Sequence, residues 1–297
     1  MYKVEVIKEN EVRFLELSNK EKTSSASICL EEGGRLEELK FDGVFLIKEQ
    51  PGFEYKDSYA SSILFPFASR IQDGKYSFQE NDYQLDCNQT GKNALHGLVY
   101  NKEFKLIEKE ENTNSCSVTI GYQETKENQG FPYTYEIYLT YTLTEKEISL
   151  SVKIKNTDSK TFPFTLGWHP YFISDDLSKS VLNFKSDKKI AFDENLITKE
   201  VVALKTPEIF KIEEKQLDDC FILNTNKIGF STPTYQIEIT TDLEDNYLQI
   251  YTPTGFSVIA IEPMTGVSNS FNNKIGLQIL QPTESYALVW NVKFNNN

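Results

Sequence analysis

The 297-residue chain has two histidines, and each lies in a short motif rich in glycine, proline or aromatic residues. His96 stands in Asn93-Ala94-Leu95-His96-Gly97, and His169 stands in Gly167-Trp168-His169-Pro170-Tyr171-Phe172. Histidine has an unperturbed pKa of about 6.5, so it can act as acid and base near neutral pH. The proline after His169 disfavours helix there, and the glycine after His96 allows a positive φ. An imidazole beside flat aromatic faces suits proton transfer to a small polar ring; the alternative is a hydrogen-bonded core histidine.

Strands must position these motifs, because the dominant hydrophobic period of the chain is two. Apolar residues alternate with polar ones along 137–144 and again along 148–154, after a turn at Glu145-Lys146. The two runs predict an antiparallel hairpin with one buried face. The same pattern returns at 286–294, and further strands are predicted at 3–7, 12–17, 25–30, 34–40, 116–122, 161–166, 180–185, 219–224, 235–241, 247–252 and 256–261.

Turn-forming residues separate these runs, at Gly33-Gly34, Asp42-Gly43, Asp73-Gly74 and Pro253-Thr254-Gly255. Helical periodicity is limited to single turns near 175–178 and 270–275. The stretch 186–217 is rich in lysine and glutamate and lacks a regular period, so we expect a loop there. Many short strands with no linker between them predict an all-β fold, a large antiparallel β-sandwich in which residues 1–297 form one domain.

Composition narrows the choice of partners and compartment. A formal net charge of −13 and the lack of a basic stripe argue against nucleic acid. The N-terminal segment carries charge throughout, and no apolar run approaches the ~18 residues of a membrane span, so we expect a cytoplasmic chain that does not enter membranes. The cysteines show no CxxC pair and are expected to be reduced and mostly structural: Cys29, Cys87, Cys116 and Cys220.

Five motifs in one order resemble those of the aldose 1-epimerase (galactose mutarotase) family, and the resemblance covers nearly the whole chain. Directly before Arg70, where some family members carry Asn, this chain has Ser69. The motifs are Leu64-Phe65-Pro66-Phe67-Ala68-Ser69-Arg70-Ile71, Asn93-Ala94-Leu95-His96-Gly97, Gly167-Trp168-His169-Pro170-Tyr171-Phe172, Leu217-Asp218-Asp219-Cys220-Phe221 and Ile261-Glu262-Pro263-Met264-Thr265-Gly266.

The resemblance implies a β-supersandwich fold and a reaction, the interconversion of the α and β anomers of an aldose through the open-chain aldehyde. It implies that Glu262 is the general base on the C1 hydroxyl and His169 the general acid on the ring oxygen. His96 would bind near the ring oxygen and the C1 hydroxyl and stabilise developing charge. Arg70 and Asp218 would hydrogen-bond the sugar hydroxyls. A neutral aldohexose such as galactose or glucose is the expected substrate.

Ring opening removes a proton from O1 and delivers one to O5, which a carboxylate and an imidazolium can do together. The reaction requires no cofactor and no metal, and the sequence has neither a glycine-rich phosphate loop nor zinc-ligand spacing at its histidines. Glu262 follows an alternating run, so we expect it to end a strand at the sheet rim, with Pro263 stopping further pairing. Structural alternatives exist: an edge-strand carboxylate for Glu262, an ion pair for Arg70, a turn for Asp218, and core positions for Trp168, Tyr171, Tyr251 and Phe271.

Two other functions remain open from the sequence. A hexose-6-phosphate 1-epimerase would clamp a phosphate with several cations, ideally arginines, and this chain has three: Arg13, Arg35 and Arg70. A non-catalytic carbohydrate-binding protein on the same fold would not need both the acid and the base, which are retained here. The preferred aldose and the oligomeric state do not follow from the sequence.

Overall fold

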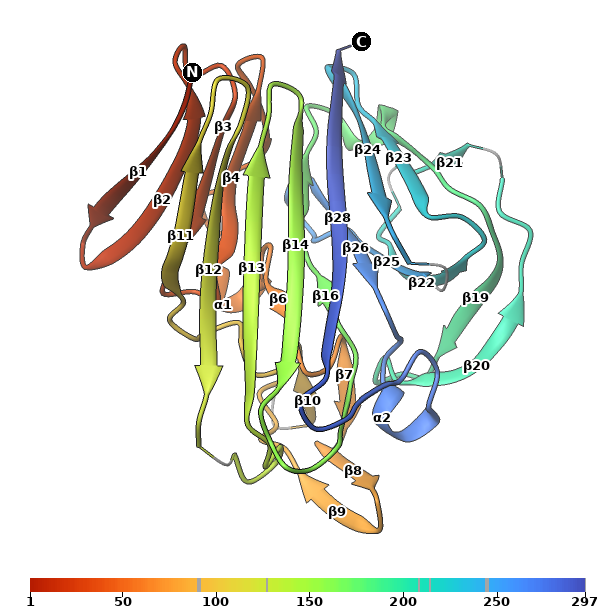
Figure 1. Cartoon of the computed structure of the whole chain (residues 1–297). Coiled ribbons are helices and arrows are strands. Elements are labelled where there is room, and N and C mark those ends of the chain that lie inside the picture. Colours follow the sequence, from red (N-terminus) through yellow and green to blue (C-terminus); the bar gives the residue numbers. More distant parts are fainter. Residues whose placement is uncertain (90–91, 127, 208, 214, 244–245, 297) are drawn as a thin grey trace.

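The computed structural model describes residues 1–297 except 90–91, 127, 208, 214, 244–245 and 297. Its described part is built mainly of antiparallel strands in three large sheets, and both termini lie at the same end of the molecule (Figure 1). The first sheet is a meander of consecutive strands, β1 (Tyr2–Glu9), β2 (Val12–Asn19), β3 (Ser25–Cys29), β4 (Arg35–Phe41) and β5 (Val44–Ile47).

The nine-stranded sheet contains the hairpin that the alternating pattern predicted. Within it, Ile137 pairs with Ile154 and Tyr141 with Leu150, so both apolar rows lie on one buried face. The C-terminal strand joins the second strand of this hairpin and extends the sheet. In spatial order the strands are β11 (Lys105–Glu111), β12 (Cys116–Glu124), β13 (Tyr135–Leu143), β14 (Glu147–Asn156), β28 (Ser285–Asn296), β24 (Tyr235–Thr241), β23 (Lys227–Ser231), β18 (Val181–Asn183) and β21 (Phe210–Lys211).

The eight-stranded sheet packs against the nine-stranded one, and the stacked rings of Trp168 and Trp290, 6.2 Å apart, join the two through the core. This packing confirms the sandwich architecture expected from the sequence. Its strands are, in spatial order, β20 (Thr198–Ala203), β19 (Ser186–Phe192), β22 (Asp218–Leu223), β25 (Asn246–Tyr251), β26 (Val258–Met264), β16 (Gly167–Trp168) and β6 (Ile63–Leu64), with β17 (Tyr171–Ile173) also paired to β26.

The prediction of a loop over 186–217 is wrong, because β19 and β20 form an edge hairpin there and β21 a further short strand. Ile190 of β19 is fully buried, but most residues of β20 are exposed, and they include the apolar Val201 as well as charged side chains. An edge strand that buries neither of its faces need not alternate apolar and polar residues, so the pattern on which the sequence prediction depends is missing there.

Short elements complete the fold and connect the large sheets. None of the helices in the described part is long and apolar enough to cross a membrane. The four cysteines are free, and three of them are buried. The short elements are α1 (Tyr55–Ser58), β7 (Arg70–Gln72) paired with β10 (Asn93–Leu95), β8 (Lys75–Phe78) paired with β9 (Asn81–Gln84), β15 (Phe162–Phe164) paired with β27 (Gln278–Leu280), the 3₁₀ turn η1 (Leu177–Lys179) and α2 (Ser270–Asn273).

Candidate active site

One cleft of about 290 Å³ brings together all five residues that the motifs singled out. Its volume is near the lower end of the range for small-molecule pockets, roughly 300–1,000 Å³. The eight-stranded sheet, the β7–β10 ribbon, α1 and the β19–β20 hairpin contribute its walls. The lining residues are Asp57, Ser58, Tyr59, Ser69, Arg70, Gln89, Leu95, His96, His169, Tyr171, Leu196, Asp218, Gln249, Tyr251 and Glu262.

Glu262 does not end a strand, so that prediction is wrong. It lies inside β26, which pairs with β25 as far as Met264 and has β16 and β17 on its other side. Ile261 N donates to Pro170 O and Thr265 N to Leu166 O, so Pro263, midway between them, faces the interruption between β16 and β17. The missing N–H of proline costs no sheet hydrogen bond at such an interruption. Glu262 is consequently buried rather than at a rim.

A row of polar side chains crosses the cleft face of this sheet. Gln249 is the register partner of Glu262, and its Nε2 donates to Asp218 Oδ1 at 2.6 Å. Apolar clusters flank the row on both sides, one around Tyr171, Val258 and Ala260 and the other around Tyr247, Cys220 and Met264. Polar groups confined to one row of an otherwise apolar surface can orient a ligand while the clusters exclude water.

His169 contacts Glu262 directly, with 3.4 Å between Nε2 and Oε1. The imidazole stacks on the ring of Tyr171, with centroids 4.9 Å apart. Its backbone is held at both ends, because His169 O accepts from Ser61 N at 2.7 Å and His169 N donates to Ser62 O at 3.1 Å. Burial lowers the pKa of His169 to about 3 and raises the pKa of Glu262 well above its ordinary value. Burial therefore favours the neutral form of both groups in the ligand-free cleft.

His96 stands edge-on to His169, with ring centroids 5.0 Å apart. Its φ is +61° and that of Gly97 is +78°, which confirms the positive φ expected at the glycine. A side chain at Gly97 would clash with Phe65 O, so only glycine fits there. The ring of Tyr59 covers another edge of His96 at 5.0 Å. Burial lowers the pKa of His96 well below its ordinary value, so this imidazole is neutral.

Arg70 of β7 and Asp218 of β22 line the same cleft. Arg70 begins β7, and its Nε donates to Gln89 Oε1 at 2.9 Å. Burial raises the pKa of Asp218, and the charge of Arg70 opposes that shift. The neighbouring Asp219 points to the other face of β22, where it pairs with Lys189. Strand alternation thus separates the roles of two adjacent aspartates, which the sequence could not do.

Ser69 lies in the cleft wall with φ of +55°, and its carbonyl accepts from His96 N at 2.9 Å. The backbone of this residue therefore ties the first motif to the second. Of the aromatic residues considered from sequence, Trp168 and Phe271 belong to the core, whereas Tyr171 and Tyr251 line the cleft.

Sequence reasoning missed several cleft residues, above all Tyr59, Gln89 and Gln249. None of them lies in one of the five motifs. Gln249 could be identified as a cleft residue only once the pairing of β25 with β26 is known, because that register places it beside Glu262. Tyr59 and Gln89 come from segments whose position depends on the tertiary fold.

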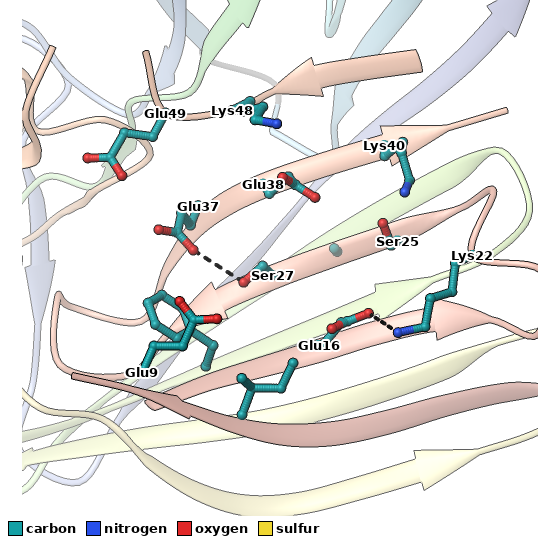
Figure 2. Close-up of a pocket in the computed structure, with 13 residues that line it drawn as sticks. Glu9, Glu16, Lys22, Ser25, Ser27, Glu37, Glu38, Lys40, Lys48 and Glu49 are labelled. Atoms are coloured by element: carbon teal, nitrogen blue, oxygen red, sulfur yellow. Dashed lines mark hydrogen bonds and ion pairs between the residues drawn. The ribbon is translucent and has the colours of Figure 1, made fainter. Parts of the chain in front are cut away.

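A second concavity, of about 360 Å³, lies on the outer face of the first sheet (Figure 2). Five glutamates and three lysines line it, and partners such as Lys22 with Glu16 and Ser27 with Glu37 already satisfy each other. Neither histidine is near it. No group of three metal-ligating side chains occurs among the residues described in the structure. The chemistry of the chain is thus concentrated in the cleft around Glu262 and His169.

Comparisons with known proteins agree with this geometry. The sequence model of the aldose 1-epimerase family matches residues 13–293. The uncharacterized protein YihR of Escherichia coli K12 is 23% identical over 273 residues, which cover 88% of this chain and 87% of YihR. Galactose mutarotase of Rattus norvegicus is 27% identical over 167 residues, 54% of this chain and 47% of the rat protein.

Solved structures share the fold over the full length. A galactose mutarotase-like protein from Clostridium acetobutylicum superposes with a TM-score of 0.88 at 22% identity, covering 100% of this chain and 99% of that one. Galactose 1-epimerase from Lactobacillus acidophilus NCFM superposes with a TM-score of 0.83 at 16% identity, covering both chains completely. The fold is therefore that of the galactose mutarotase-like proteins.

Proposed function

Because this chain belongs to the aldose 1-epimerase family, we propose that it interconverts the α and β anomers of a neutral aldohexose such as galactose or glucose. The contact of 3.4 Å between His169 Nε2 and Glu262 Oε1 carries the proposal. A proton donor and a proton acceptor this close together can both reach the C1–O5 edge of one sugar ring. Catalysis at that edge is what anomer exchange requires.

In the proposed reaction the Glu262 carboxylate takes the proton of the C1 hydroxyl. The C1–O5 bond breaks as the C1–O1 double bond forms, and O5 takes a proton from the His169 imidazolium. Rotation about C1–C2 then presents the other face of the aldehyde to O5. The same steps in reverse close the ring as the opposite anomer: Glu262 gives its proton back to O1, and His169 takes a proton back from O5. Each general acid or base contributes about 10² to 10⁴ in rate.

The proton count of the ligand-free pair already matches this scheme. Burial favours a neutral carboxyl group and a neutral imidazole, and in that form the pair holds one titratable proton. Moving that proton from Glu262 to His169 produces the carboxylate and imidazolium that act on the sugar. The charged form becomes accessible when sugar hydroxyls replace the apolar surroundings of the pair with hydrogen-bond donors and acceptors.

Other residues of the cleft hold the sugar in this pose. His96 is neutral and lies beside His169, so it can hydrogen-bond the ring oxygen or the C1 hydroxyl without competing for the proton. Arg70 offers donors and Asp218 offers an acceptor to the remaining hydroxyls. Gln249 supports Asp218 from the side by its hydrogen bond.

The charges of the cleft favour a neutral sugar over a 6-phosphate. Asp57, Asp218 and Glu262 line it, and Arg70 is the one cationic side chain among the lining residues that the structure describes. A phosphate would need several arginines or lysines to replace its lost hydration. With one cationic side chain among acidic ones, the added charge of the phosphate would remain largely uncompensated.

Polarimetry on freshly dissolved α-galactose and α-glucose, with and without protein, tests the proposal. We expect the protein to accelerate the approach to the equilibrium rotation for at least one of the two sugars. Tight binding of both sugars without any acceleration would instead identify a carbohydrate-binding protein on the same fold.

A further inference from the structure

Arg70 depends on a single neutral partner for the orientation of its side chain. In the described part of the chain its guanidinium makes one hydrogen bond, from Nε to Gln89 Oε1 at 2.9 Å, and no ion pair. Burial lowers the pKa of Arg70, while the charges of Asp218 and Glu262 oppose that shift from a distance. An arginine side chain has about 2 kcal/mol of rotamer freedom. Without a partner inside the protein, the side chain would lose this freedom only when a ligand binds, at a cost in affinity.

Gln89 accepts from Nε of Arg70, and this choice of atom leaves the Nη donors to other partners. Nε carries one N–H, and the two Nη atoms carry the other four, none of which makes a hydrogen bond to the residues that the structure describes. An amide oxygen fixes the side chain without neutralising it.

Both ends of this hydrogen bond are anchored by the backbone. Gln89 N donates to Asn93 O at 3.1 Å, and Asn93 begins β10, the strand that pairs with β7. Leu95 of β10 is the register partner of Arg70, and Arg70 O accepts from Asn269 N at 2.6 Å. The distance between the Cα atoms of Gln89 and Arg70 is thereby set by the ribbon.

We propose that Gln89 is a positioning residue for sugar recognition, whose side-chain oxygen holds Arg70 Nε so that both Nη atoms face the hydroxyls of the bound ring. The inference rests on the proposed function, because it takes a sugar as the ligand of the cleft. Holding the guanidinium in its binding orientation before the sugar arrives lowers the ordering cost of binding. The held donors bind the ground state and the transition state equally, so the benefit lies in affinity.

Two variants and one control test the role. Gln89→Met keeps the length of the side chain but removes the acceptor, and Gln89→Glu keeps an oxygen in place. Gln72→Met makes the same change at an exposed position of the same ribbon. We would measure kcat and KM for galactose and glucose by polarimetry. Calorimetry would measure the affinity for 1,5-anhydrogalactitol and 1,5-anhydroglucitol, which keep the hydroxyls at C2, C3, C4 and C6 but cannot open.

We expect Gln89→Met to weaken binding and raise KM about tenfold, the effect of losing one hydrogen bond to a charged group, with kcat changed less than about threefold. Gln89→Glu should restore affinity to within about threefold of wild type, and Gln72→Met should match wild type. Wild-type affinity in Gln89→Met, or an equal loss in Gln89→Met and Gln89→Glu, would overturn the positioning role.

The two proposals fail in different ways. A wild-type chain that binds the anhydro sugars through Gln89 but accelerates no anomer exchange would overturn the proposed activity and retain the positioning role. An active wild-type chain with an unaffected Gln89→Met variant would do the reverse. A wild-type chain that binds no anhydro sugar and turns over neither hexose would overturn both.

Discussion

The imidazole Nε2 of His169 lies 3.4 Å from the Oε1 of Glu262, and the two side chains are only 5% and 4% exposed. Opposite charges at this distance normally stabilise each other, but burial favours the neutral form of both groups here. The neutral form of the pair is therefore one proton transfer away from the form that the proposed reaction needs, and we propose that a bound sugar supplies the polar contacts that permit the transfer. This relationship leads to the following predictions.

Glu262→Gln should lower kcat by about 10² or more, because the amide keeps the shape of the side chain but cannot take the O1 proton. Sugar affinity should change far less, since the hydrogen-bonding capacity of the residue is retained. Polarimetry at saturating sugar gives kcat, and calorimetry gives the affinity. Unchanged kcat would reduce Glu262 to a sugar-holding residue and favour the binding-protein function.

His169→Asn should abolish most catalysis while the chain still folds, because an amide does not give up a proton near pH 7. The backbone hydrogen bonds of His169 with Ser61 and Ser62 do not involve its side chain and should persist. Initial rates by polarimetry, with circular dichroism as the folding control, check this. Turnover close to that of the wild type would show that the acid lies elsewhere.

His96→Asn should cost less activity than His169→Asn. The proposed role of His96 is to hydrogen-bond the sugar, and asparagine can still donate and accept a hydrogen bond. We expect a larger change in KM than in kcat, measured for both variants under the same conditions. An equal loss of kcat in the two variants would instead mean that His96 also transfers a proton.

A neutral aldose should be turned over with a higher kcat/KM than its 6-phosphate. The cleft has carboxyl groups at Asp57, Asp218 and Glu262, and the whole chain has a formal net charge of −13. Glucose and glucose 6-phosphate compared at one ionic strength provide the measurement. A clear preference for the phosphate would point to a hexose-6-phosphate epimerase.

His169 and Glu262 should contribute to the free energy of unfolding with opposite pH dependence. Burial lowers the folded-state pKa of His169 from 6.5 to about 3, so between those values the unfolded chain binds a proton that the folded chain does not. This contribution to stability is present above pH 6.5 and is lost as the pH falls towards 3. The free energy of unfolding of wild type minus that of His169→Asn should therefore decrease from pH 7 to pH 4.

Glu262→Gln is the matched comparison for this experiment. The folded-state pKa of Glu262 is raised above 4.5, so its contribution is present at low pH and is lost as the pH rises beyond 4.5. The corresponding difference in the free energy of unfolding should decrease with rising pH. Denaturant titrations at several pH values measure both, and parallel curves for the two variants would contradict the assigned pKa shifts.

The sequence alone determined the architecture wherever one strand face is buried and the other solvated. The hairpin of β13 and β14 follows directly from its alternation, and so does the C-terminal strand β28, because a period of two places every second side chain in the core. The ordered motifs around His96, His169 and Glu262 also indicated the family that the comparisons support.

Only the tertiary structure decided which neighbours complete the site. Gln249 reaches Glu262 through strand register, Gln89 reaches Arg70 across a ribbon, and Tyr59 covers His96 from a separate turn. Such contacts join residues far apart in the chain, so no local pattern encodes them. The same reason explains why Glu262 lies inside β26: the gap between β16 and β17, which lets the strand continue past Pro263, belongs to a different part of the sequence.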